Sequence, residues 1–184
     1  MTFNEICNGA YVFPLFSDAF CNELIKETEK YGKWSPGGDD KRPDNRLGGV
    51  VENVPTQDIH LNQINFDKQW EHIVFNYIAP IASHIYDGYS TKSINISFVI
   101  KYSVDGQKEL KYHHDSSTYT LKVALNRRNI DFEGGGAYFL KYKASDGDYM
   151  DRGMGIIHPG KLTHKHKGVP ITSGTRYVLV SFIN

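Results

Sequence analysis

A chain of 184 residues that carries 21 basic and 21 acidic side chains has no formal net charge at neutral pH. The balanced charge disfavours a nucleic-acid partner, and no apolar run approaches the roughly 20 residues that span a bilayer. A chain of this length can bury roughly 70% of the surface that its unfolded form exposes, so it needs no disulfide or metal in order to fold. We expect one domain over residues 1–184, without a transmembrane segment.

The N-terminus lacks a basic segment followed by an apolar core, so no signal peptide is predicted. Two cysteines, Cys7 and Cys21, allow one disulfide at most and form no CxxC pair. Two buried thiols and a Cys7–Cys21 bridge are both compatible with this count.

The first half of the chain predicts two helices separated by a long loop. Residues 11–16 form a strand-like aromatic run, after which Ser17 can cap an amphipathic helix that stops at Gly32. Residues 34–58 are rich in turn formers, and a loop this long in a compact domain is usually functional or disordered. Helical spacing of apolar residues returns over 66–85, with a kink expected at Pro80.

From residue 94 onward the apolar period changes from that of a helix to two, which is typical of strands. Ile94 to Tyr102 is the clearest example, because every second residue is Ile, Phe or Tyr. Further strand-like segments lie at 119–125, 137–142, 155–158, 161–166 and 175–183, with turn signals between them. We expect a mainly β fold with flanking helices (α+β), namely an antiparallel double-stranded β-helix, or jelly roll, covered by the helices on one side.

The stretch His113-His114-Asp115 suggests a metal site. In an extended segment residues i and i+2 leave the same face, so His113 and Asp115 point together while His114 points away. Two histidines and one carboxylate form the facial set that suits non-haem Fe(II). The third ligand can be His166 or His164, because both would share one face of a strand.

Arg176 completes the constellation. A hairpin formed by the last two strands around residues 167–175 would place His166 and Arg176 nearly opposite each other. The rigid fork of Arg suits the distal carboxylate of a 2-oxo acid whose near end chelates iron. The alternative reading is that His166 is an exposed strand residue and Arg176 pairs with a carboxylate at the rim.

The remaining motifs have simpler interpretations. His158 and His164 are expected to face solvent or to form hydrogen bonds; the second hypothesis is an accessory metal site near Leu162 at a subunit contact. Gly134-Gly135-Gly136 is expected to be a tight turn, because no phosphate-loop Lys-Ser/Thr follows it. The basic run over 161–167 is too short to indicate nucleic-acid binding.

Longer motifs surround these residues and carry a resemblance to a known family. They include Tyr31-Gly32-Lys33-Trp34-Ser35, Glu52-Asn53-Val54-Pro55-Thr56, His113-His114-Asp115-Ser116-Ser117-Thr118, His158-Pro159-Gly160-Lys161-Leu162-Thr163-His164 and Gly174-Thr175-Arg176-Tyr177. Together they resemble, close to chain length, the C-terminal catalytic domain of the collagen lysyl hydroxylases (procollagen-lysine 2-oxoglutarate 5-dioxygenases). The frequent Lys, Asn and Ile residues further resemble the giant-virus (mimivirus) branch of that family.

The resemblance implies roles for individual residues. The family's distal iron ligand lies ten residues before its 2-oxoglutarate arginine, so counting back from Arg176 implies that His166, rather than His164, is the third iron ligand. Tyr102 is implied to line the 2-oxoglutarate pocket, whereas Ala124 lacks the tyrosine hydroxyl that related prolyl hydroxylases carry there. The loop after Trp34 is implied to cap the site. The acidic partner of the substrate ammonium is left open among Asp44, Glu52 and Glu133.

The resemblance also implies an activity, namely hydroxylation at C5 of lysines in collagen-like Lys-Gly sequences. The reaction consumes O2 and 2-oxoglutarate, releases succinate and CO2, and relies on ascorbate to restore Fe(II). Family members work as homodimers in the lumen of the endoplasmic reticulum. For a viral member, this would be the endoplasmic reticulum of the host cell. Family members are also often longer than this chain. The rival readings are a 2-oxoglutarate hydroxylase of prolyl or small-molecule substrates and a non-catalytic jelly-roll binding module.

Overall fold

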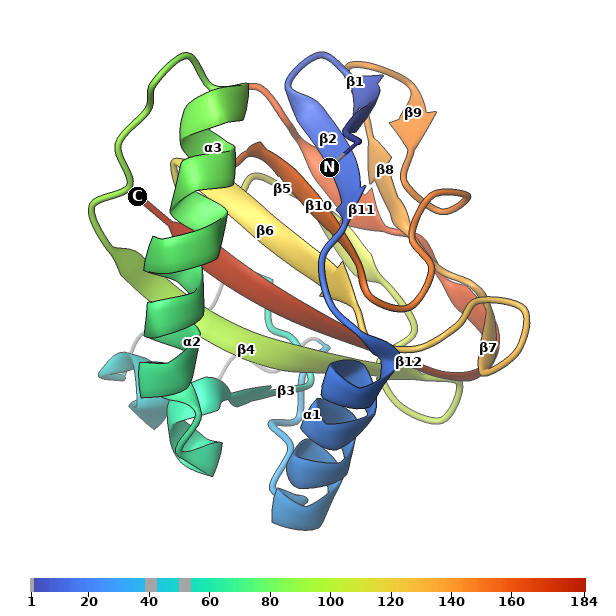
Figure 1. The fold of residues 1–184 in the computed structure, drawn as a ribbon. Coiled ribbons are helices and arrows are strands. Elements are labelled where there is room, and N and C mark those ends of the chain that lie inside the picture. Colours follow the sequence, from blue (N-terminus) through green and yellow to red (C-terminus); the bar gives the residue numbers. More distant parts are fainter. Residues whose placement is uncertain (1, 39–42, 50–53) are drawn as a thin grey trace.

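Two β-sheets face each other in the computed structural model, which describes residues 2–38, 43–49 and 54–184 (Figure 1). The larger sheet has the order β1-β2-β10-β6-β12-β4-β3, with β7 beside β12, and the smaller has the order β5-β11-β8-β9. The predicted mainly β fold with flanking helices is confirmed. The larger sheet comprises β1 (Asn4–Cys7), β2 (Ala10–Pro14), β3 (Asp58–His60), β4 (Ile94–Ser103), β6 (Tyr119–Ala124), β7 (Phe132–Gly134), β10 (Met154–Pro159) and β12 (Ile171–Ile183). The smaller comprises β5 (Leu110–His113), β8 (Ala137–Phe139), β9 (Ala144–Ser145) and β11 (His166–Gly168).

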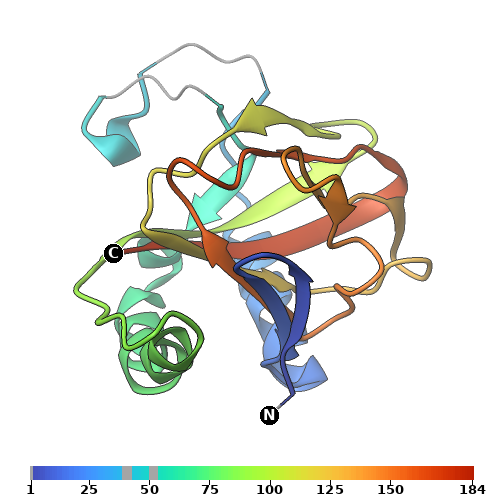
Figure 2. The same cartoon turned by 90° about the horizontal axis from the view of Figure 1, so that it is seen from above.

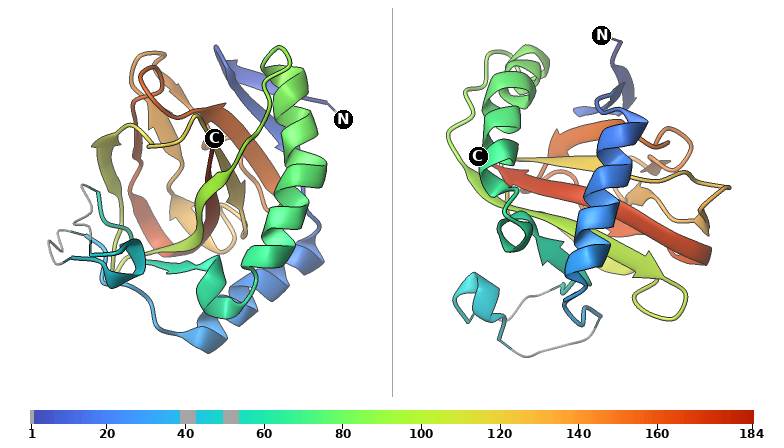
Figure 3. Two further views of the ribbon diagram at one scale, coloured as in Figure 1. Left: turned by 90° about the vertical axis from the view of Figure 1, so that its left-hand side faces the viewer. Right: turned by 60° about the horizontal axis from the view of Figure 1, so that its bottom comes forward.

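The helices cover the outer face of the larger sheet, and Figures 2 and 3 show them on one side of the paired sheets. Helix α1 (Asp18–Tyr31) begins where the Ser17 hydroxyl accepts the Phe20 N–H and ends at Gly32, which is left-handed with φ 66°. Both ends therefore lie where the capping residues predicted them.

The second helical stretch is continuous but not uniform. It runs as α2 (Asp67–Ile73), a π-helical turn η3 (Val74–Ile78) and α3 (Ala79–Ile85). Pro80 occupies the first turn of α3, so the predicted irregularity falls one turn before the proline. The Trp70 indole N–H donates to the Ser181 hydroxyl at 2.7 Å and ties α2 to β12.

The register of the larger sheet positions the residues that face the smaller sheet. Arg176 of β12 lies opposite Tyr102 of β4, and Phe182 lies opposite Thr120 of β6. Between these two rows Val180 lies opposite Lys122. The alternation of β4 turns Ile96, Phe98 and Ile100 toward the smaller sheet, as the period of two predicted.

Two expectations about the C-terminal strands are wrong. β11 and β12 do not form a hairpin, because β11 pairs with β5 and β8 in the smaller sheet while β12 lies in the larger one. At their junction the Val169 N–H donates to the Gly136 carbonyl, and Pro170, which has no N–H, interrupts pairing. Residues 161–165 are not a strand either, since Leu162 has a positive φ of 72°.

Both thiols are free, with Cys21 buried and Cys7 partly buried, so the reading without a disulfide is confirmed. Across the described residues, no helix combines the length and the apolar character required to cross a bilayer.

Candidate metal and anion site

The structure brings His113, Asp115 and His166 together. His113 ends β5, His166 begins β11, and the antiparallel register places these two residues opposite each other. Asp115 follows two residues after His113, and one possible ligand atom from each of the three lies within 4.8 Å of the others. His113 Nε2 is 3.3 Å and His166 Nε2 is 3.9 Å from Asp115 Oδ1. No other such group is found among the described residues.

Main-chain carbonyls orient both imidazoles. His113 Nδ1 lies 2.7 Å from the Lys111 carbonyl, and His166 Nδ1 lies 3.0 Å from the His164 carbonyl. A carbonyl only accepts, so each Nδ1 carries a proton and each Nε2 is turned toward Asp115. This orientation is the one that a divalent cation bound at Nε2 requires.

The carboxylate of Asp115 is held in the charged form. Its Oδ2 accepts the Thr120 hydroxyl at 2.6 Å, which leaves Oδ1 facing the two imidazoles. Burial alone would raise the pKa of Asp115, but His113, His166 and His158 hold it well below its usual range. Burial lowers the pKa of His166 to about 4, so this side chain is neutral at pH 7.

Arg176 lies in the same pocket and has no carboxylate partner among the described residues. Arg176 is only 8% exposed, and its guanidinium lies 5.6 Å from the ring centroid of Tyr102 and 5.9 Å from the ring centroid of Phe132. A Cβ at Gly135, where φ is 70°, would lie 3.1 Å from Arg176 Cδ, so glycine allows the arginine to pack there. A buried cation without a counter-ion is energetically unfavourable, so this site favours the binding of an anionic ligand.

The two groups occupy opposite ends of one cavity of about 520 Å³ between the sheets. Tyr102, whose pKa burial raises to about 12, lines this cavity at the Arg176 end, and its role toward 2-oxoglutarate stays a prediction. The walls between the ends are largely apolar and are formed by Ile96, Phe98, Ile100, Val178, Val180 and Phe182. Leu47 and Thr56 contribute to the rim, so the loop after Trp34 does border this cavity.

Lys122 is a cavity residue that the sequence analysis missed. It is 8% exposed, and its ammonium lies 3.5 Å from Asp146, which is itself buried. Its position on β6 places it between the row of Thr120 and the row of Arg176. The available signal was a lysine within Tyr119–Ala124, an otherwise strand-like run in which every residue proves to be buried.

His158 and His164 are buried and hydrogen-bonded, so solvent exposure was the wrong alternative. His158 Nδ1 lies 2.9 Å from the Pro159 carbonyl, and His164 Nε2 lies 2.9 Å from the Asn8 carbonyl. His158 Nε2 lies 3.8 Å from Asp115 Oδ2 and has no hydrogen-bond partner. Leu162 is 89% exposed, and within the described chain neither histidine joins a metal-binding group.

The acidic candidates for the substrate ammonium differ in availability. Both Asp44 oxygens bind Arg46, through Nε at 3.0 Å and Nη2 at 2.5 Å. Glu133 is exposed on β7 and does not line the cavity, and Glu52 lies outside the described residues. Arg46 also binds the buried Asp58 at 2.6 Å, so this network ties the rim to β3.

Comparisons with known proteins agree on a fold and a group of relatives. The chain is 49% identical over 179 residues to chicken procollagen-lysine,2-oxoglutarate 5-dioxygenase 1 and 50% identical over 183 residues to the procollagen lysyl hydroxylase and glycosyltransferase of Acanthamoeba polyphaga mimivirus. These matches cover 97% and 99% of the chain, which spans only 24% and 20% of the two relatives.

Among solved structures, a Pseudomonas putida prolyl-4-hydroxylase is similar with a TM-score of 0.67 at 13% identity, over 96% of this chain and 92% of the other. The fold is therefore the jelly roll of 2-oxoglutarate and Fe(II) oxygenases. No protein-family model matches the chain.

Proposed function

We propose that this chain, whose homologues are the procollagen-lysine 5-dioxygenases, is a catalytic domain that hydroxylates peptidyl lysine with Fe(II) and 2-oxoglutarate. The observation that carries the proposal is the pairing, within one cavity, of a His-Asp-His cluster with a buried arginine that lacks a counter-ion. We take residues 1–184 to be one such domain of a longer protein.

The donor set fits Fe(II). His113 and His166 each offer an imidazole nitrogen, Asp115 offers one carboxylate oxygen, and three ligands leave coordination positions open for a co-substrate. The metal supplies the oxidising chemistry when it is bound with O2 and a 2-oxo acid. The chain's own contribution is to fix the ligands, through the carbonyls behind each imidazole and the Thr120 hydroxyl behind Asp115.

The opposite end of the cavity fits a dicarboxylate. Arg176 would bind the distal carboxylate of 2-oxoglutarate, with Tyr102 beside it, while the near end reaches the metal. The apolar walls exclude water from the space between, which strengthens both interactions. Lys122, one row from the metal end, adds a second cation to the cavity and lies two residues before Ala124 on β6.

The substrate and the conditions follow from the relatives. We propose that collagen-like chains with Lys-Gly sequences are hydroxylated at C5 of lysine, that ascorbate keeps the iron reduced, and that the whole protein is a homodimer of the endoplasmic reticulum lumen, or the host's if it is viral. The second candidate function is hydroxylation of prolyl residues, because the solved structure reported above is a prolyl-4-hydroxylase. A non-catalytic binding module is disfavoured by the joint presence of Asp115, His166 and Arg176 in one cavity.

One experiment tests the proposal. The chain is incubated with Fe(II), ascorbate and 2-oxoglutarate, and with collagen-like peptides that contain either lysine or proline as the acceptor. We expect succinate release that depends on the lysine peptide and a mass gain of one oxygen atom on lysine. Oxygen addition to proline alone would favour the second candidate, and no turnover of either peptide would contradict both.

Asp115→Ala is the control for this experiment. Because the carboxylate supplies one of three ligands, its loss should reduce iron affinity by more than the roughly 100-fold that outer-shell changes reach. Bound iron, measured by metal analysis after desalting, should fall together with succinate release. A variant that keeps its iron would show that Asp115 is not a ligand.

A further inference from the structure

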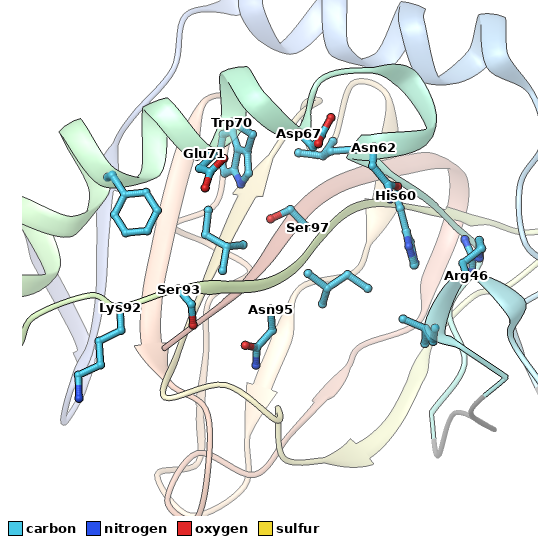
Figure 4. Close-up of a pocket in the computed structure, with 15 residues that line it drawn as sticks. Arg46, His60, Asn62, Asp67, Trp70, Glu71, Lys92, Ser93, Asn95 and Ser97 are labelled. Carbon is cyan, nitrogen blue, oxygen red and sulfur yellow. The ribbon is translucent and has the colours of Figure 1, made fainter.

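A second hollow, of about 440 Å³, lies beside the metal cavity along one edge of β4 (Figure 4). We call it the edge groove, and define it by Asn62, Asp67, Trp70, Phe75, Asn95 and Ser97. Figure 4 shows that α2 and the turn before it form one wall, while β4 and the residues that precede it form the other. Phe75 is 37% exposed here, so part of the wall is apolar.

The main chain of β4 is open at this groove. β3 pairs with β4 only over Phe98–Ile100, and the Lys101 N–H donates to the Gln57 carbonyl on that edge at 2.8 Å. Alternate residues of a strand face the same edge, so the main chain of Ser97 also points to it. The pairing of His60 with Phe98 brings the Leu61 N–H to the Ser97 carbonyl, where the 3-10 helix η2 (Leu61–Ile64) begins, so on this edge β3 leaves the Ser97 N–H and the main chain before it without a strand partner.

No described strand pairs with this edge of β4 before Ser97. Unpaired main-chain groups on a sheet edge are the template to which an extended peptide adds as a further strand. The edge groove contains such a template.

The groove opens into the metal cavity, because Leu47, Asn95 and Ile96 line both. Ile96 lies in the same row of the sheet as Thr120, whose hydroxyl holds Asp115, with only β12 between them. Two strand spacings correspond to roughly 10 Å. Since an extended chain advances about 3.3 Å per residue, a segment in the groove lies about three residues from one whose side chain reaches the metal.

The charges of the groove disfavour an anionic ligand. Arg46 is bound by Asp44 and Asp58 outside the groove, which leaves Lys92 beside the carboxylates of Asp67 and Glu71. Burial lowers the pKa of His60, so this wall adds no positive charge at pH 7. Main-chain amides suit such a surface better than a phosphate or another anion does.

We propose that the edge groove binds an extended segment of the polypeptide substrate, about three residues from the hydroxylated lysine, by main-chain hydrogen bonds to the Ser97 N–H and to the open edge of β4 before it. The proposal rests on the function proposed above and adds a subsite to it. Two or three added hydrogen bonds should lower the KM of a peptide that fills the groove about tenfold relative to one that does not.

The test compares a short lysine peptide, with one residue on each side of the lysine, with a long one that has six on each side. Asn62→Trp and Glu71→Trp, both exposed groove positions, should block the groove. Each should raise the KM of the long peptide to that of the short one, while turnover of the short peptide and the KM for 2-oxoglutarate stay unchanged. Gln69→Trp, exposed on α2 outside the groove, should behave as the unmodified chain.

Equal KM values for the long peptide in the blocked and unblocked proteins would overturn the proposal. So would a change of oligomeric mass in the blocked variants with peptide KM unaltered, since the groove would then bind a second copy of the chain. If no lysine peptide is turned over, the proposed function fails by itself. Fluorescence anisotropy of a labelled long peptide then decides for the groove if binding weakens in Asn62→Trp, and against it if binding does not.

Discussion

The two ends of the metal cavity differ in whether their charged side chains have partners within the protein. At the metal end every side chain has its supporting partner, because a carbonyl holds each imidazole and Thr120 holds Asp115. At the other end Arg176 contacts only the faces of aromatic rings and has no carboxylate partner in the described chain. The first end is arranged before any ligand arrives, whereas the second lacks its counter-ion. The comparison teaches that the orientation of the metal ligands and the positive charge for an anion are supplied by different residues. A mutation can therefore remove one without the other.

Arg176→Ala should separate the two ends most clearly. Removal of one partner from a buried charge pair costs about 2–5 kcal/mol, so the KM for 2-oxoglutarate should rise at least about 30-fold. Iron content, measured on the same preparation, should not change. Arg176→Lys keeps the charge but not the fork and should lose less. Equal loss of iron in Arg176→Ala would instead assign the arginine a structural role.

Thr120→Val tests the metal end in the opposite direction. Without the hydroxyl, the carboxylate of Asp115 loses its fixed orientation, and iron affinity should fall roughly 10- to 100-fold. The measurement is an iron titration, with the KM for 2-oxoglutarate at saturating iron as the second readout and no change expected there. Thr118→Val is the matched control, because Thr118 is exposed and its hydroxyl bonds Asn184 instead. Similar iron affinity in both variants would show that the Thr120 hydroxyl does not support iron binding.

Acid should weaken the metal end even without metal. Burial lowers the pKa values of His158 and His166, the latter from 6.5 to about 4. Between these values the unfolded chain binds more protons than the folded one, so the free energy of unfolding falls as the pH falls. We expect a loss of about 2 kcal/mol from pH 6.5 to 5 in urea unfolding of the metal-free protein. A flat profile would mean that these imidazoles are protonated in the folded state.

Lys122→Met should have the smallest effect. Because Asp146 already neutralises part of its charge, the KM for 2-oxoglutarate should rise less than about tenfold. Lys122→Met also leaves Asp146 unpaired, so the double variant with Asp146→Asn is the proper comparison. If the double variant matches the unmodified chain while the single one does not, the ammonium serves the ion pair and not the co-substrate.

Local patterns in the sequence predicted the features that depend on residues close in the chain, such as the face to which a side chain points and the ends of a helix. The period of two brought His113 and Asp115 to one face, and Ser17 and Gly32 marked the ends of α1. What depends on contacts between distant strands was not predictable in this way. The sheet to which a short strand belongs is decided by pairing across the core, so β11 and β12 were wrongly joined as a hairpin. For the same reason Lys122 was missed, since its burial follows from β12 and β10 on either side.

The stiffness of β12 has a consequence for the choice of co-substrate. This single strand carries Arg176 and, six residues later, Phe182, which lies in the row of the metal end. A strand with partners on both sides does not shorten or stretch, so the spacing between the row of Arg176 and the row of Phe182 is constant. We therefore expect the cavity to select a diacid by the length of its carbon chain. A 2-oxo diacid one carbon shorter or longer than 2-oxoglutarate would leave one charged end unpaired, and such a mismatch is rejected far more strongly than a change in apolar bulk.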